Sequence, residues 1–121
     1  MLKQNEVVHL DSDQLEKLFE QLGEAGAEDV VCRALEELAV RLTHAERCWR
    51  EGGNADMRKS TRSLVAIAEQ IGMNTLARVA MDVIVCVDRG DQIAVAATLT
   101  RLIRIGESSL SEIWDLQGLT L

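Results

Sequence analysis

The sequence predicts an all-α fold, an antiparallel four-helix bundle with a short N-terminal helix in front of it. Three observations lead to this prediction. The 121 residues include no proline, and the eight glycines fall mainly between segments of helical periodicity. Apolar residues make up 47 % of the chain, enough to fill one core, and they recur at steps of three and four. The length is that of one domain, which we expect to span residues 1–121.

The first two helices are separated by glycine. The first begins after Asp11, which can cap it, and Gln14 lies three residues on, where its side chain can bond back to the cap. It is expected to end at Gly23. The second helix runs from about Ala27 to Glu51. Its apolar stripe consists of Val31, Leu35, Leu38, Leu42, Ala45 and Trp49.

The third helix runs from about Ala55 to Ile71, and Asn54 is the expected cap. Its apolar stripe consists of Met57, Thr61, Leu64, Ala68 and Ile71. Gly72 ends this helix, and Asn74 or Thr75 is expected to cap the next one.

The fourth helix contains the one segment that also has the composition of a buried strand. Ten of the twelve residues from Leu76 to Val87 are apolar. No second strand-like run exists to pair with it, so we predict a helix that ends at Gly90. Because this helix is apolar nearly all round, it is either the central helix of the bundle or has one face covered by another subunit.

The fifth helix runs from Gln92 toward Trp114, with Asp91 as its cap. Gly106 lies inside it and predicts a slight bend or a close approach of a neighbouring element. The side chains that we expect in the core of the bundle include Leu38, Leu42, Leu64, Ile71, Val83 and Leu102.

Charge and composition argue against several classes of partner. The 20 acidic residues outnumber the 13 basic ones, which gives a formal charge of −7, so phosphate backbones and anionic lipid would repel the chain. Aromatic residues make up only 2 % and offer few platforms for stacked bases. We therefore expect no nucleic-acid partner and no membrane association. No signal peptide is visible and no apolar run reaches the roughly 18 residues of a membrane helix, so a cytoplasmic location is expected.

No cofactor, metal or catalytic residue is expected from the motifs. Cys32, Cys48 and Cys86 form no C-x-x-C pair, and His9 and His44 stand 35 positions apart. Neither a Glu-x-x-His pair nor a phosphate-binding glycine loop occurs. Three reduced, mostly buried thiols are the expected state of the cysteines.

A basic spot is predicted on the outward face of the third helix. At about 100° per residue, Arg62 lies about 140° from the centre of the apolar stripe. It should therefore be exposed near the middle of the helix, with no buried acidic partner in the chain. The face could be an ordinary solvated one, or a docking spot for an acidic partner. That docking face consists of Arg58, Lys59, Arg62, Val65, Ala66 and Glu69.

The helical plan and the run from Arg62 to Gly72 resemble the histidine-containing phosphotransfer (HPt) domain. The motif of that family begins with the phospho-accepting histidine and continues with an apolar residue at plus two, a small one at plus six, an apolar one at plus nine and glycine at plus ten. The matching residues are Leu64, Ala68, Ile71 and Gly72. The likeness covers most of the chain, roughly residues 8–110.

Three other positions of the motif differ in this sequence. Arg62 stands at the phospho-acceptor position, and arginine stays protonated, with no free lone pair for a phosphoryl group. Val65 stands where the family has a lysine that neutralises phosphoryl charge, and Ala66 where it has a glycine that lets a partner approach. The resemblance therefore implies a non-catalytic module of a bacterial phosphorelay (two-component) system. Such a module binds a response-regulator receiver domain or a histidine kinase without passing phosphate.

Two other interpretations stay open at this stage. One is a helical assembly protein with no signalling role, in which the apolar fourth helix or the tail around Trp114 builds a homodimer. The other is an active phosphotransferase that uses His44, although Ala45 to Arg47 do not reproduce the motif.

Overall fold

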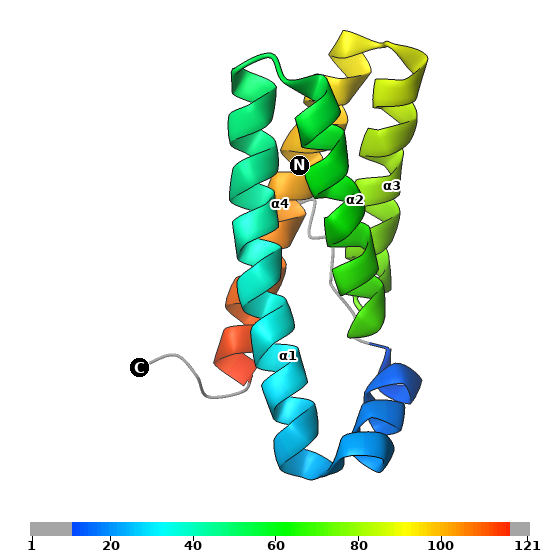
Figure 1. The fold of residues 1–121 in the computed structure, drawn as a ribbon, viewed down its shortest axis with the longest axis vertical. Helices are drawn as coiled ribbons and strands as arrows, with labels where there is room; N and C mark the ends of the chain where they lie inside the picture. Colours follow the sequence, from blue (N-terminus) through cyan, green and yellow to red (C-terminus); the bar gives the residue numbers. More distant parts are fainter. Residues whose placement is uncertain (1–10, 117–121) are drawn as a thin grey trace, which may run out of the picture.

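The computed structural model describes the backbone of residues 11–116 and the side chains of residues 11–112. This part of the chain folds into four α-helices and contains no strand (Figure 1). The helices are α1 (Ser12–Arg50), α2 (Asn54–Gln70), α3 (Asn74–Arg89) and α4 (Gln92–Leu116). The all-α prediction is confirmed, and residues 76–87 are helical. The side chain of Trp114 and residues 1–10 lie outside the described part.

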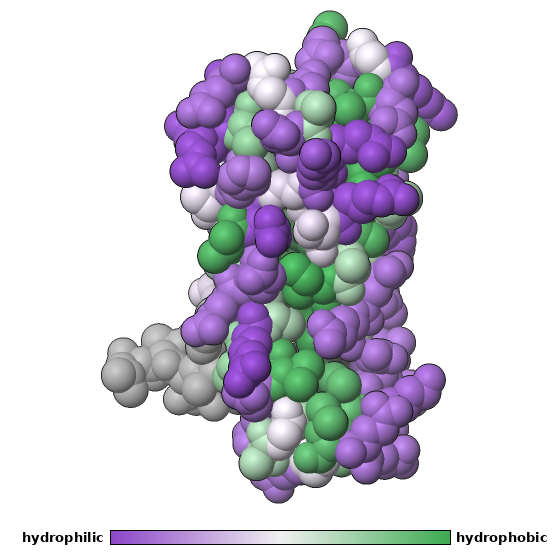
Figure 2. Space-filling model, in the orientation of Figure 1, coloured by the Kyte–Doolittle hydropathy of each residue, from purple (hydrophilic) through white to green (hydrophobic). Residues whose placement is uncertain are grey.

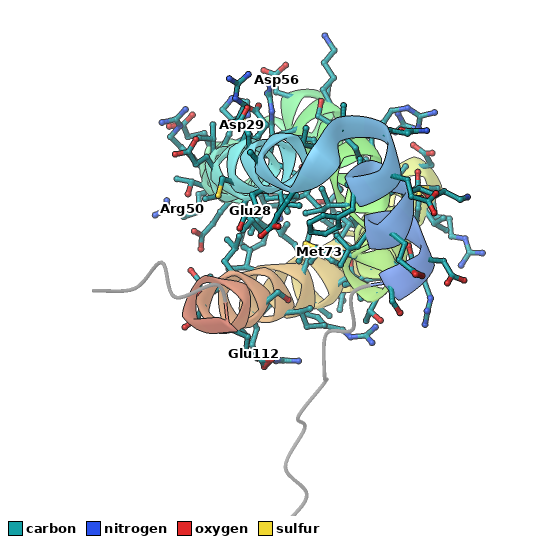
Figure 3. All side chains as sticks on the ribbon, turned by 90° about the horizontal axis from the view of Figure 1, so that it is seen from below. Glu28, Asp29, Arg50, Asp56, Met73 and Glu112 are labelled. Atoms are coloured by element: carbon teal, nitrogen blue, oxygen red, sulfur yellow. The ribbon has the colours of Figure 1, made fainter. Side chains whose placement is uncertain are left out.

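α1 bends sharply at Gly23, whose φ of 76° and ψ of 174° are adopted essentially only by glycine. The bend divides α1 into a short arm, residues 12–22, and a long arm, residues 24–50 (Figures 1 and 3). The short arm is the predicted first helix, which ends where expected. The second helix, however, continues from the bend itself, and no loop separates the two as the sequence had suggested.

The long arm, α2, α3 and α4 form an antiparallel four-helix bundle. Short turns join them, and each turn contains a glycine with a positive φ: Gly52 at 80°, Gly72 at 77° and Gly90 at 72°. α4 also packs against the long arm and so closes the bundle.

The core contains all six side chains that the sequence placed there, and none of them is more than 5 % exposed: Leu38, Leu42, Leu64, Ile71, Val83 and Leu102. Met73 points inward between the helices, whereas Asp29 and Asp56 point outward (Figure 3). The predicted close approach at Gly106 is confirmed, because a Cβ atom there would lie 2.5 Å from Cδ1 of Leu42.

Two of the predicted helix caps are confirmed. Asp11 accepts hydrogen bonds from the amides of residues 13 and 14, and Asp91 accepts one from the amide of Ala94 at 3.1 Å. The prediction for Asn54 is wrong. Gly53 occupies the cap position of α2, and the Asn54 side chain donates to Gln92 Oε1 at 3.3 Å instead.

The short arm is fastened to the turn between α2 and α3. The Asp11 amide donates to the Gly72 carbonyl at 2.8 Å, and Gln14 Nε2 donates to the Gln70 carbonyl at 2.9 Å. Asn74 Nδ2 donates to Asp11 Oδ2 at 3.3 Å. Asn74 or Thr75 was expected to cap the following helix, but Met73 occupies that cap position. Gln14 was expected to bond back to its own cap. The side chains of Gln14 and Asn74 instead join the short arm to this turn.

Candidate functional site

The outward side of α2 carries a row of exposed side chains. Lys59, Arg62, Ala66 and Glu69 are exposed, and steps of three, four and three place them on one side of the helix. We refer to these four residues as the α2 ridge. The opposite side of α2 is held in the core, where Leu64 is fully buried. The bundle therefore fixes the direction in which the ridge faces.

Arg62 lies in the middle of the ridge and is exposed, as the helical angle predicted. Lys59 precedes it by one turn, and Ala66, which has only a methyl group, follows it by one turn. Within the described part of the chain, no hydrogen bond or ion pair holds the Arg62 guanidinium. A partner can therefore reach this group without displacing a bulky neighbour.

Arg58 was expected on the docking face, but its side chain pairs with a neighbouring helix on the surface of the bundle. It pairs with Asp88 on α3, with 2.7 Å between Nε and Oδ1 and 2.9 Å between Nη2 and Oδ2. This hydrogen bond lowers the pKa of Asp88, and the positive charges of Arg58 and Arg62 lower it further. The same contact raises the pKa of Arg58. Both oxygens of the carboxylate are thus occupied by one guanidinium.

Val65 does not lie on the ridge, and its placement on the docking face is wrong. It is 8 % exposed and belongs to the hydrophobic core. One residue after Leu64, it is turned by about 100° and reaches the side of α2 that packs on the bundle. The position where the HPt motif has a lysine is therefore a core position in this chain.

The four residues that match the HPt motif are all buried. Leu64, Ala68 and Ile71 have no exposed surface. Gly72 occupies the left-handed region, and a Cβ atom there would lie 2.9 Å from the Cβ of Asp11. These residues hold α2 and its turn in place beneath the ridge.

Two hydroxyl groups on the inner side of α2 help to position the ridge. Ser60 donates to the Arg41 carbonyl of α1 at 3.0 Å, and Thr61 donates to the Met57 carbonyl of its own helix at 2.8 Å. The apolar stripe included Thr61, but nothing in the sequence identified Ser60 as a link between helices. Neither did the sequence identify Asp88 as a residue of this region.

His44 is half-buried on α1. Its Nε2 lies 3.5 Å from Sγ of Cys48. A hollow of about 450 Å³ lies beside it on the outside of α1, lined by Ala39, Val40, Arg41, Thr43, His44 and Arg47. Among residues 11–112, no group of three or more His, Cys, Asp or Glu side chains could hold a metal ion.

Comparison of the chain with protein-family models, with curated proteins and with solved structures finds no match. The resemblance to HPt domains therefore rests on the motif positions and on the helical plan. None of the helices in the described part of the chain combines the length and the apolar character needed to cross a membrane.

Proposed function

We propose that this chain is a non-catalytic, HPt-like docking module of a bacterial phosphorelay, which binds an acidic site on a receiver domain or histidine kinase through the α2 ridge. The observation that carries the proposal is the exposed Arg62 guanidinium in the middle of that ridge. It occupies the position that the HPt motif gives to the phospho-accepting histidine.

A guanidinium suits an acidic site because its planar N–H groups can donate two parallel hydrogen bonds to one carboxylate. By the resemblance, a receiver domain holds its phospho-accepting aspartate in an acidic pocket. Arg62 can enter such a pocket as a bidentate donor, and Lys59 adds a second positive charge one turn away. Ala66 keeps the approach open. The ridge thereby offers a local positive site on a chain whose formal charge is −7.

Asp88 is a carboxylate whose pKa the positive charge of Arg62 lowers, so it could compete with a partner for this guanidinium. Its two oxygens, however, accept hydrogen bonds from Arg58 at 2.7 and 2.9 Å. Arg58 therefore satisfies the internal carboxylate, and the N–H groups of Arg62 stay available for an external one.

Docking by this ridge would not transfer phosphate. The Arg62 guanidinium stays protonated and has no lone pair to attack a phosphoryl group. Val65, at the position of the neutralising lysine, is buried. The proposed role is therefore to occupy or block the partner's phosphorylation pocket.

The test is a titration of receiver and kinase domains from the same genome with the wild-type chain, Arg62→Ala, Arg62→Lys and Arg33→Ala. Arg33 is a matched control, because it lies on α1 with its side chain 77 % exposed and its loss changes the net charge by the same amount. We expect Arg62→Ala to lose about 2–5 kcal/mol of binding free energy, as is usual for one partner of a desolvated charge pair. Arg62→Lys keeps the positive charge but loses the planar pair of N–H donors, so its affinity should lie between those of the wild type and Arg62→Ala.

If Arg62 lay at the solvent-exposed edge of the interface instead, Arg62→Ala would lose about 1 kcal/mol or less of binding free energy, and this loss would shrink at high salt. Equal affinities of Arg62→Ala and Arg33→Ala for every domain would refute the proposed docking role. So would the absence of binding by the wild-type chain to every receiver and kinase in the panel.

A further inference from the structure

The bend of α1 depends on two glycines. Gly23 adopts a φ of 76° and a ψ of 174°, a conformation essentially closed to other residues. At Gly26, an added Cβ atom would lie only 3.0 Å from the Cβ of Leu22, because the bend folds the short arm back over the long one. In a straight helix, side chains four residues apart have Cβ atoms about 5–6 Å from each other. The bent form requires a glycine at position 23 and is crowded by any larger residue at position 26, whereas a straight helix needs neither glycine.

The other residues at the bend favour a continuous helix. Glu24, Ala25, Ala27 and Glu28 belong to the residue types with high helix propensity. Apart from Gly23 itself, residues 12–50 are already helical on both sides of the bend. A change in the backbone of this one residue would therefore join the two arms into a single straight helix.

The short arm is held by polar contacts at the turn between α2 and α3 and by its buried Leu18. Its polar contacts there are those of Asp11 with Gly72 and Asn74, and of Gln14 with Gln70. Leu18 is buried in the core, whereas Phe19 and Leu22 are 43 % and 47 % exposed. The same arm on a second copy of the chain can make these polar contacts, because they join the arm only to residues 70–74.

Hydrophobic surface lies where the two arms of α1 diverge. Figure 2 shows hydrophobic side chains running down the middle of this face to its base, in the region between the short arm and the long arm. Leu15 of the short arm and Val30 of the long arm are only partly buried. A long arm from a second copy, passing beside this one, would cover this surface.

We propose that two copies of this chain exchange their short arms. In the dimer, α1 runs straight through Gly23, and each short arm docks on the α2–α3 turn of the other copy. The exchange keeps the polar contacts of Asp11 and Gln14, releases the unusual backbone conformation of both Gly23 residues and covers the surface between the arms. Because two molecules must meet, the dimer forms in a concentration-dependent equilibrium with the bent monomer.

The first experiment measures this equilibrium by analytical ultracentrifugation for the wild-type chain, Gly23→Ala, Gly26→Ala and Gly53→Ala. Gly53 is the matched control, because its φ is −91° and an added Cβ atom makes only an ordinary contact, 3.5 Å from the Cys48 carbonyl. Gly23→Ala should strengthen dimerisation about 100-fold, since strain worth roughly a tenfold factor is released at each of two bends. Gly26→Ala should shift the equilibrium in the same direction, and Gly53→Ala should not.

The second experiment shows which chain each arm contacts. Two variants in a cysteine-free background, one with Gln14→Cys and the other with Gln70→Cys, are mixed, equilibrated and treated with a short bis-maleimide. Exchange of the arms brings positions 14 and 70 of different chains together, because Gln14 Nε2 donates to the Gln70 carbonyl at 2.9 Å, and so yields a cross-linked heterodimer. A chain carrying both substitutions serves as the positive control for the bent monomer.

The proposal requires concentration-dependent dimers and cross-links between the singly substituted chains, both increased by Gly23→Ala. It is overturned if Gly23→Ala and Gly26→Ala stay monomeric at the highest concentrations tested, whether their short arms are docked or released. It is equally overturned if dimers form without any cross-link between the two singly substituted chains.

Discussion

Replacing Gly72 with alanine should destabilise the protein more than replacing any other glycine of the interhelical turns. Gly72 joins α2 to α3 with a φ of 77°, and its carbonyl accepts the Asp11 amide at 2.8 Å. An added Cβ atom would lie 2.9 Å from the Asp11 Cβ, 3.0 Å from its nitrogen and 3.1 Å from its oxygen. Two of these three atoms belong to the backbone and cannot be moved by a rotamer change.

The expected cost has two parts. A non-glycine residue in the left-handed region costs about 1–2 kcal/mol. Separating Asp11 from the turn then loses a hydrogen bond worth about 1 kcal/mol and adds crowding of about 1 kcal/mol or more. The free energy of unfolding should therefore fall by about 3–4 kcal/mol in Gly72→Ala.

Gly52→Ala is the control for the first part alone. Gly52 has a φ of 80°, but no atom lies within 4 Å of a Cβ atom placed on it. Urea unfolding of both variants should give a difference of about 2 kcal/mol between them, provided that their m-values agree. Equal losses of stability would refute the reasoning that the short arm is fastened at Gly72.

Two further predictions concern the bundle. Arg58 lowers the pKa of Asp88 in the folded protein below that of an unfolded aspartate, which is about 3.9. The ionised carboxylate therefore stabilises the fold above a pH of about 3.9, and this stabilisation is lost as the pH falls through the lower folded pKa. Asp88→Asn should therefore reduce the loss of stability across that acidic window, which urea unfolding at several pH values checks; an unchanged pH profile would contradict it. Gly106→Ala should lower the free energy of unfolding by about 1–3 kcal/mol, because the added methyl group overpacks against Leu42. Adding Leu42→Val should recover part of this loss in a double-mutant cycle. Additive losses would show that the two side chains do not meet.

Glycine positions explain why the fold could be predicted from the sequence. Gly23, Gly52, Gly72 and Gly90 mark the breaks between the predicted helices, and each of them has a positive φ in the structure. The apolar stripes placed the core correctly, since burial repeats with the period of the helix. The apolar stripes could not show that the first two predicted helices are joined directly. In the structure the single residue Gly23 forms a bend between them, with no loop.

Contacts between helices explain the wrong cap assignments. Asn54 and Asn74 are residue types that cap helices, but their side chains donate to Gln92 and Asp11. A side chain that can bond its own backbone can also bond a neighbouring helix. Which of the two contacts forms depends on the packing of the bundle, and local sequence carries no information about that packing.

The candidate site was only partly predictable for the same reason. The exposure of Arg62 follows from its angle on α2. The burial of Val65 depends on which flank of α2 the bundle covers, and the Arg58–Asp88 pair joins residues that are 30 positions apart. Both depend on the register between helices, which no spacing in the sequence reveals.

The proposed entry of Arg62 into the phosphorylation pocket of a receiver can be tested by phosphorylating that receiver with a small-molecule phosphodonor while the chain is bound. Saturating wild-type chain should slow phosphorylation of the receiver aspartate, and no acid-labile phosphate should appear on the chain itself. The same concentration of Arg62→Ala should leave the rate unchanged, and Arg33→Ala should inhibit like the wild type. Equal inhibition by the wild type and Arg62→Ala would show that Arg62 does not occupy the pocket, and phosphate on His44 would show that the chain is not a non-catalytic module.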